Sequence, residues 1–134
     1  MILNHVELQV SNVKTAREFF EVHFGLRCTY QRGEQIAILE DEGGFCFGVS
    51  NLRHEPPPVY RPDFHVGFVL KDVRQVREIY SRIKAAGVGI KFDLQEAGPN
   101  LAFQCLGPDA IPVEVRAPLK SAQRRGTAAP ATSS

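Results

Sequence analysis

The sequence lacks the features that direct a chain into a membrane, onto a nucleic acid or into a secretory pathway. No apolar run approaches the ~20 residues that a membrane-spanning helix requires. The 16 basic and 15 acidic residues are spread along the chain and leave a net charge of +1, so no basic patch indicates nucleic-acid binding. The N-terminus lacks the positive segment and the small-residue cleavage site of a signal peptide.

Cysteine is also scarce. Cys28, Cys46 and Cys105 are an odd number at wide and irregular spacing. This argues against a disulfide framework or a zinc knuckle and favours a reducing compartment. We therefore expect a soluble cytoplasmic domain with neither a membrane nor a nucleic-acid partner.

The most informative pattern is an internal repeat, because residues 4–20 are matched sixty positions later by residues 64–80. The shift aligns His5 with His65, and a repeat of this kind determines the architecture. The other identical pairs are Val6 with Val66, Val13 with Val73, Arg17 with Arg77 and Glu18 with Glu78. A chain of 134 residues can bury one core but is small for two independent ones. We interpret the repeats as two halves of one domain.

Each half is predicted to be a strand, a helix and three further strands. Period-2 alternation predicts the strands, and apolar residues at i, i+3 and i+4 predict the helices. The first half has a strand over 2–10, a helix over 13–24 and strands near 27–32, 35–40 and 45–50. The second has a strand over 63–70, a helix from 73 that Gly87 closes, and strands near 89–94, 100–106 and 111–116. Ser11 or Asn12 caps the first helix, and Asp72 with Gln75 fits a capping box on the second.

These elements predict an α+β fold in which two βαβββ modules form a curved half-barrel with external helices and a cleft within. Module 1 spans 1–50 and module 2 spans 63–118, in a single domain over 1–118. The connector 51–62 contains three consecutive prolines, which favour an extended segment. Residues 119–134 are small, polar and aperiodic, and we expect a disordered tail there.

Strand alternation predicts that three potential metal ligands face the cleft. His5 and His65 lie on the polar faces of the two opening strands, and Glu114 lies opposite Val113 and Val115 on the last strand. Two imidazoles and one carboxylate form a facial triad with open positions for water or substrate. Such a set suits one divalent ion: Fe²⁺, Mn²⁺, Ni²⁺, Co²⁺ or Zn²⁺.

A simpler interpretation competes with the metal site. A strand histidine is more often an ordinary polar group, which is how we interpret His23 and His54. Glu114 could pair with Arg116 instead of a metal. The equivalent positions of His5 and His65 in the repeat favour a shared function.

Three segments resemble the vicinal oxygen chelate superfamily of glyoxalases, extradiol dioxygenases, fosfomycin-resistance proteins and bleomycin-binding proteins. They are NHVELQVSNVKTAREFFEVHFGL, FHVGFVLKDV and LGPDAIPVEV, and the resemblance covers roughly residues 2–117. It implies the paired βαβββ fold and metal ligands at His5, His65 and Glu114. It also implies a homodimer, in some relatives formed by exchange of modules.

The chain departs from each named branch of this family. Glyoxalases have a fourth ligand, usually Glu, where this chain has Gly48, so their four-ligand pattern is broken. Fosfomycin-resistance proteins have serines, a lysine and a tyrosine where this chain has Gly98, Ala102 and Gln104. Bleomycin-binding relatives lack the ligand set. Extradiol dioxygenases use a histidine and a tyrosine as acid–base partners, for which His54 and Tyr60 are the available candidates.

Alternation places further side chains on the predicted cleft face. Glu7 is more typical of a partner that orients a ligand, or of an ion-pair partner of Arg116, than of a catalytic base, for which it is the candidate here. Cys46 is more typical of a packed small side chain than of a nucleophile. The candidate substrate-binding residues are Gln9, Cys46, Gln104 and Arg116, and Gly67 shares their face.

Three functions remain open. The first is a metal-dependent lyase, isomerase or dioxygenase whose ion binds vicinal oxygens of a small substrate. The second is a protein that binds and sequesters a small molecule without catalysis, as bleomycin-resistance proteins do. The third is a structural or regulatory relative without a ligand.

Overall fold

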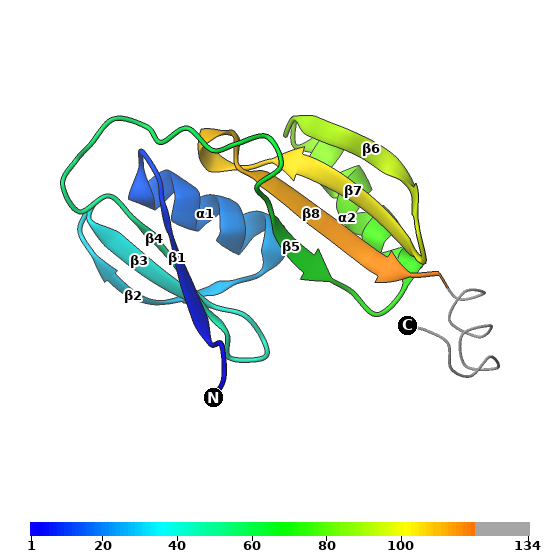
Figure 1. The fold of residues 1–134 in the computed structure, drawn as a ribbon, viewed down its shortest axis with the longest axis horizontal. Coiled ribbons are helices and arrows are strands. Elements are labelled where there is room, and N and C mark those ends of the chain that lie inside the picture. The colour runs from blue at the N-terminus through cyan, green and yellow to red at the C-terminus, as the bar shows by residue number, and fades with distance from the viewer. Residues whose placement is uncertain (120–134) are drawn as a thin grey trace. The chain divides into compact units, whose positions relative to one another are not determined.

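The computed structural model describes residues 1–119, which form two compact units (Figure 1). The first unit contains Met1–Arg61 together with Gly107–Ala110, and the second contains Pro62–Leu106 with the described residues from Ile111 onward. Each unit holds one helix and one four-stranded sheet, so the predicted α+β fold of two βαβββ modules is confirmed. Of the predicted tail, residues 120–134 lie outside the described part.

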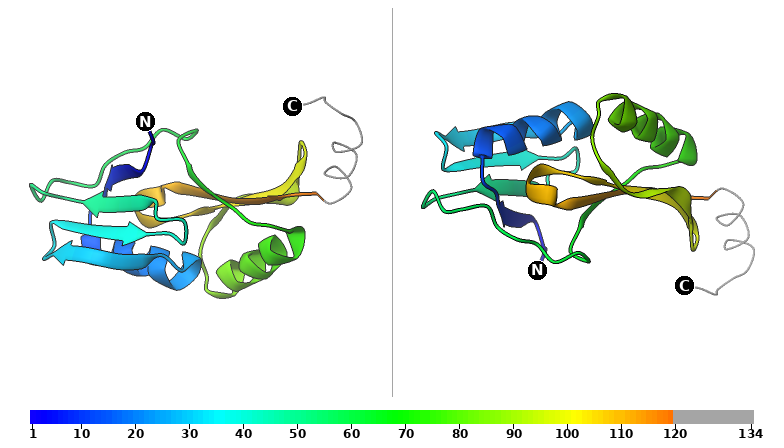
Figure 2. Two further views of the ribbon diagram at one scale, coloured as in Figure 1. Left: turned by 90° about the horizontal axis from the view of Figure 1, so that it is seen from below. Right: turned by 90° about the horizontal axis from the view of Figure 1, so that it is seen from above.

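The first unit follows the predicted element order. Its elements are β1 (His5–Gln9), α1 (Val13–Phe24), β2 (Arg27–Arg32), β3 (Ile36–Glu40) and β4 (Cys46–Ser50). The sheet order is β1-β4-β3-β2, with β1 parallel to β4 and the other pairs antiparallel. Helix α1 packs on one face of this sheet (Figure 2), where Phe20 contacts Phe47 edge-on at a centroid distance of 4.8 Å. The buried side chains of this face include Leu8 and Val49.

The second unit repeats this layout. Its elements are β5 (Val66–Val69), α2 (Val73–Ala85), β6 (Ile90–Ala97), β7 (Asn100–Leu106) and β8 (Pro112–Pro118). The order β5-β8-β7-β6 is that of the first sheet, again with the opening strand parallel to the last. Tyr80 of α2 contacts Phe103 of β7 at a centroid distance of 5.2 Å, which identifies the face that the helix covers. The strands β1 and β5 are shorter than predicted, because their pairing with β4 and β8 covers only residues 5–9 and 66–69.

Both helices begin and end at the predicted signals. Asn12 caps α1 by accepting a hydrogen bond from the Thr15 amide at 2.9 Å, which decides between the two predicted caps. Asp72 and Gln75 form the predicted capping box of α2. Gly25 ends α1 with a positive φ of 69°, a conformation that glycine adopts without a Cβ clash. Within residues 1–119, neither helix combines the length and apolarity needed to cross a bilayer.

The turn between β7 and β8 has a strained backbone. It contains a 3-10 helix over Pro108–Ala110 in which Asp109 and Ala110 have positive φ values of 56° and 60°. The Asp109 carboxylate accepts two hydrogen bonds from Ser11, from its amide at 2.8 Å and from its hydroxyl at 2.7 Å. These bonds explain why residues 107–110 group with the first unit although both flanking strands belong to the second.

The Ala110→Gly variant tests this strain. Because a left-handed conformation costs an L-residue about 1 kcal/mol, we expect the glycine variant to be more stable by about that amount. The same change at Ala86, where φ is −80°, is the matched control. It should destabilise the protein by about 0.5–1 kcal/mol, since glycine there only adds flexibility. Urea denaturation measures both variants, and loss of stability in Ala110→Gly would contradict the assignment.

The connector between the modules has no regular secondary structure. Asn51 holds its first turn by accepting a hydrogen bond from the Glu55 amide at 2.8 Å. Near its end, the Tyr60 hydroxyl donates to the backbone carbonyl of Gln9 on β1. Partial burial raises the pKa of Tyr60 above its ordinary 10.0, and the negative charge of Asp109 adds to the rise. The connector is therefore fixed to the first module at both of these residues.

Tyr60 should make stability sensitive to alkaline pH. The pKa of Tyr60 is higher in the folded than in the unfolded chain. Its contribution to the free energy of unfolding is therefore fully present below pH 10 and is lost as the pH rises through the pKa of the folded state. The free energy of unfolding should then fall more steeply above pH 10 in the wild type than in Tyr60→Phe. Tyr30→Phe, which removes an exposed phenol, is the control. Equal slopes for wild type and Tyr60→Phe would contradict the prediction.

Candidate functional site

In the first unit, a pocket lies on the sheet face that α1 does not cover. Phe47 contacts α1, so its neighbours Cys46 and Gly48 on β4 project to the opposite face. Register places His5 beside Cys46 and Glu7 beside Gly48. The pocket has a volume of about 230 Å³ and is lined by Asn4, His5, Val6, Glu7, Ile38, Cys46 and Gly48. The predicted candidates His5, Glu7 and Cys46 thus lie together.

His5 offers one ring nitrogen for coordination. Its Nδ1 lies 2.8 Å from the Oδ1 of Asn4, and an amide oxygen only accepts hydrogen bonds. Nδ1 therefore carries the proton, and in the neutral ring Nε2 carries the free lone pair. A hydrogen bond from one nitrogen that fixes the tautomer of the other is the usual arrangement of a metal-binding histidine.

His65 has the same arrangement in the second unit. Its Nδ1 lies 3.1 Å from the backbone carbonyl oxygen of Asp63, which is also an acceptor only. Its Nε2 lies 3.4 Å from the Oε1 of Glu114, with side-chain exposures of 43% for His65 and 21% for Glu114. In the neutral ring these two atoms are both electron-pair donors and repel each other. A cation placed between the two atoms would satisfy both lone pairs.

A glycine lies opposite Glu114 on the neighbouring strand. Gly67 on β5 is the register partner of Glu114 on β8, and a Cβ atom on Gly67 would lie 3.7 Å from the Glu114 Oε1. The competing ion pair with Arg116 is not formed in residues 1–119, where the ion-pair partner of Glu114 is His65. Arg116 is exposed two residues further along β8, where its register partner is Val69.

Of the predicted triad, the structure brings two members together. His65 and Glu114 are in contact, whereas His5 belongs to the other compact unit. In the described range 1–119, no three or more His, Cys, Asp or Glu side chains group closely enough to hold a metal. The donor set itself fits a divalent ion, because each imidazole has Nδ1 bonded to an oxygen and Nε2 left for coordination. The three-residue metal site stays a prediction.

Glu7 is held by a hydrogen bond that the sequence did not reveal. Its Oε2 accepts a bond of 2.7 Å from the hydroxyl of Ser50, a side chain that is only 2% exposed. Glu7 also lies over Gly48, since a Cβ atom there would be 3.4 Å from the Glu7 Cγ. This contact fixes the carboxylate on the pocket face, where it can accept a proton or orient a ligand.

Three of the predicted substrate-binding residues remain to be placed: Gln104, Cys46 and Gln9. Gln104 on β7 is the register partner of Glu114, so the two share a face, and Gln104 is half-buried. Cys46 is half-buried beside His5, with its Sγ 4.0 Å from the Oε2 of Glu40, a weak contact typical of a packed thiol. Gln9 faces a second pocket, described next.

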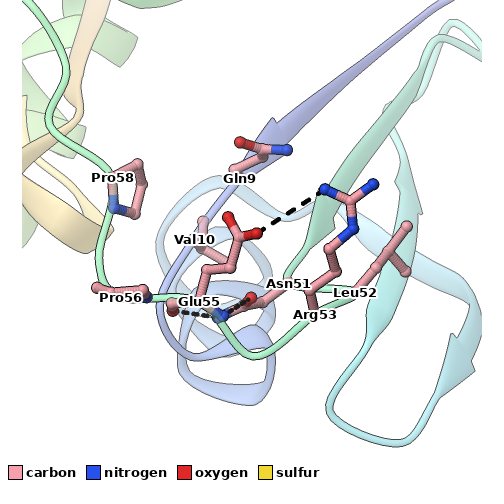
Figure 3. Close-up of a pocket in the computed structure, with 8 residues that line it drawn as sticks. All are labelled: Gln9, Val10, Asn51, Leu52, Arg53, Glu55, Pro56 and Pro58. Carbon is pink, nitrogen blue, oxygen red and sulfur yellow. Dashed lines mark hydrogen bonds and ion pairs between the residues drawn. The ribbon is translucent and has the colours of Figure 1, made fainter.

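A second pocket lies between β1 and the connector (Figure 3) and was not predicted. It has a volume of about 240 Å³ and is lined by Gln9, Val10, Asn51, Leu52, Arg53, Glu55, Pro56 and Pro58. Arg53 and Glu55 form an exposed ion pair of 3.8 Å across it. No local motif marks these residues, because the pocket arises from the path of an irregular segment. It contains none of the predicted metal ligands.

Comparison with known proteins identifies the family. The family model described as the Glyoxalase/Bleomycin resistance protein/Dioxygenase superfamily matches residues 2–115. A solved structure of a possible glyoxalase from Bacillus cereus is 31% identical, with a TM-score of 0.76, covering 86% of this chain and 97% of that chain. A comparison with curated proteins found no match.

Two further solved structures share the fold. Lactoylglutathione lyase from Agrobacterium tumefaciens is 16% identical, with a TM-score of 0.72 and coverage of 87% of this chain and 92% of that chain. A glyoxylase/bleomycin resistance protein/dioxygenase domain from Frankia sp. EAN1pec is 17% identical, with a TM-score of 0.75 and coverage of 88% and 92%. The predicted resemblance is confirmed: the chain belongs to the glyoxalase/bleomycin resistance protein/dioxygenase superfamily.

Proposed function

We propose that this protein is a metal-dependent enzyme in which His5, His65 and Glu114 bind one divalent ion. The observation that carries the proposal is the contact of 3.4 Å between the Nε2 of His65 and the Oε1 of Glu114. Because the Nδ1 atom of His65 is committed to a carbonyl oxygen, this contact has no hydrogen of its own in the neutral ring. A metal cation satisfies both atoms at once.

The choice of ion follows from the donors. Neutral imidazole nitrogen and carboxylate oxygen suit Fe²⁺, Mn²⁺, Ni²⁺, Co²⁺ and Zn²⁺. Three protein ligands leave positions for the adjacent oxygens of a small substrate. When bound, the ion would act as a Lewis acid toward those oxygens, which is compatible with lyase, isomerase or dioxygenase chemistry.

The surrounding side chains are assigned by the faces they share with these donors. Glu7 is the proposed proton acceptor, because its carboxylate lies in the His5 pocket and is oriented by Ser50. In the second unit, Gln104 and the exposed Arg116 supply an amide and a cationic donor for substrate oxygens. Gln9 and Cys46 complete the proposed substrate contacts. We also propose a homodimer, which light scattering would test.

A small-molecule-binding protein without catalysis is the second candidate. The pocket between β1 and the connector favours it, because that pocket is independent of the metal donors. Such a protein would bind its ligand equally well with and without a metal. Ligand binding measured in the presence and absence of a chelator separates the two functions.

The metal content of the purified protein tests the enzyme proposal. We expect one ion per chain in the wild type, and a loss of affinity of at least ~100-fold in Glu114→Gln, because the amide replaces an anionic ligand by a neutral one. Glu96→Gln, which changes an exposed glutamate on β6 of the same module, is the matched control and should bind like the wild type. Elemental analysis after incubation with each ion gives the stoichiometry.

Two results would reject the metal site. One is a wild-type protein that takes up none of the five ions. The other is equal metal content in Glu114→Gln and wild type, which would place the ion elsewhere. The melting temperatures of the metal-free proteins serve as the folding check, since a misfolded variant would also lose metal.

A further inference from the structure

The pocket between β1 and the connector brings two opposite charges together. Arg53 and Glu55 both line it, and Figure 3 shows their charged ends directed toward each other. The Nη1 of Arg53 lies 3.8 Å from the Oε2 of Glu55, which is beyond hydrogen-bond distance, and the side chains are 85% and 61% exposed. An exposed ion pair of this length adds little to stability, so a bound molecule can separate it at little cost.

Both charged side chains keep most of their bonding capacity. A guanidinium has five N–H donors, and a carboxylate accepts hydrogen bonds at two oxygens. Within residues 1–119, the interaction that the side chains of Arg53 and Glu55 make is their mutual ion pair, and neither has a hydrogen bond to another side chain or to the backbone. The exposed side chain of Gln9 lines the same pocket. The pocket therefore offers a cation, an anion and an amide to a bound molecule.

The backbone around the pocket is held in place by the protein itself. Asn51 accepts a hydrogen bond from the Glu55 amide at 2.8 Å and donates one to the Glu55 carbonyl at 3.1 Å. The three prolines at 56–58 follow, and their rings restrict the φ angles of this segment. The Tyr60 hydroxyl then donates to the Gln9 carbonyl. A pocket that is formed in advance loses little conformational entropy when a small molecule binds.

Part of the pocket wall is apolar. It consists of Val10, Leu52, Pro56 and Pro58. Val10 is buried, whereas Leu52 is 51% exposed, so a ligand against Leu52 would shield apolar surface from water. The volume of about 240 Å³ is below the range of about 300–1,000 Å³ that is typical of pockets for drug-sized ligands. The pocket therefore suits a small molecule with a short aliphatic body.

The two charges select against ligands that carry a single charge. A carboxylate that binds Arg53 is repelled by Glu55 beside it, and an ammonium that binds Glu55 is repelled by Arg53. A molecule that carries both charges close together satisfies both side chains. In an α-amino acid the ammonium and the carboxylate are attached to the same carbon, so their partners must also be close together. The separation of 3.8 Å between the Arg53 Nη1 and the Glu55 Oε2 meets this requirement.

From this arrangement we infer that the pocket between β1 and the connector binds a free α-amino acid with an aliphatic side chain. The ligand carboxylate pairs with Arg53, its ammonium pairs with Glu55, and its side chain packs against Leu52 and the prolines. The inference rests on the second candidate function, small-molecule binding without catalysis, and names its ligand class. It does not depend on the proposed metal site, because the pocket contains none of the three proposed metal ligands.

Calorimetric titration with matched ligands tests the charge pattern. L-Leucine should bind saturably to the wild-type protein. Leucine amide keeps only the ammonium and N-acetyl-leucine keeps only the carboxylate, so each should bind at least ~10-fold more weakly than leucine. Aminocaproic acid is an isomer of leucine with its two charges at opposite ends of the chain. It should be weakened similarly, because its charges are too far apart for two neighbouring partners.

Two variants should change the ligand preference. Arg53→Gln should bind leucine at least ~10-fold more weakly, yet bind leucine amide better than the wild type does, because the repelling charge is removed. Glu55→Gln should behave in the same way toward N-acetyl-leucine. Both variants keep the turn, because the hydrogen bonds of Asn51 use the Glu55 backbone. The matched control is Arg27→Gln, which breaks an exposed ion pair with Glu40 outside the pocket and should bind every ligand like the wild type.

Leucine binding with and without a chelator separates this inference from the metal site. We expect equal affinity in metal-loaded and chelator-treated protein, with the NMR shifts of backbone amides concentrated in residues 51–55. Loss of leucine binding on chelation would overturn the inference, because the ligand would then lie on the metal. Equal affinity for leucine and its singly charged analogues would also overturn it, as would a folded wild type that does not bind leucine at millimolar concentration. A protein that binds leucine but no metal would reject only the metal-dependent function.

Discussion

The parallel pairing of the first and last strand in each module is the constraint on which the candidate site depends. This pairing determines which side chains are register partners on the two strands. It therefore determines which glutamate lies opposite which glycine. In the first module, the buried Leu8 lies opposite Val49, with both on the face that α1 covers. A slip of one residue would expose these side chains and bury His5 and Glu7. The hydrophobic core thus fixes the register that positions the polar face.

The two histidines show how backbone and side-chain acceptors orient an imidazole ring. Asn4 and the carbonyl of Asp63 each accept the Nδ1 proton of a neighbouring ring. Each contact joins residues that are one or two positions apart in the sequence, so it forms together with the strand. They leave each Nε2 atom as the free electron pair. The local chain therefore determines the tautomer, and the sheet determines where that electron pair points.

Local sequence signals predicted the elements well, because their causes are local. Asp72 and Gln75 form a capping box that involves residues three apart, and Gly25 ends a helix through its own φ value. Contacts between distant residues were missed for the opposite reason. Ser11 and Asp109 are 98 residues apart, and Glu7 and Ser50 are 43 apart. Neither pair has a pattern that could be recognised without the strand order.

The interpretation of Gly48 shows the same limit at the candidate site. Compared position by position with a family that has a glutamate there, it indicates a lost ligand. The strand register gives it a different meaning, because Glu7 occupies the space above it. A comparison along one strand cannot detect which side chain of the neighbouring strand lies beside a glycine. The sequence predicted His5, His65 and Glu114 as candidate ligands from strand alternation, but it could not pair Glu7 with Gly48.

Sterics and charge both disfavour a second glutamate opposite Glu7. A Cβ atom at position 48 would already lie 3.4 Å from the Glu7 Cγ, so a second long side chain there would displace the first. Two carboxylates on one rung would also repel each other across adjacent strands. In both modules the residue opposite the glutamate is a glycine. Each glycine leaves open space beside a carboxylate, and the two modules keep this pairing with the strands interchanged.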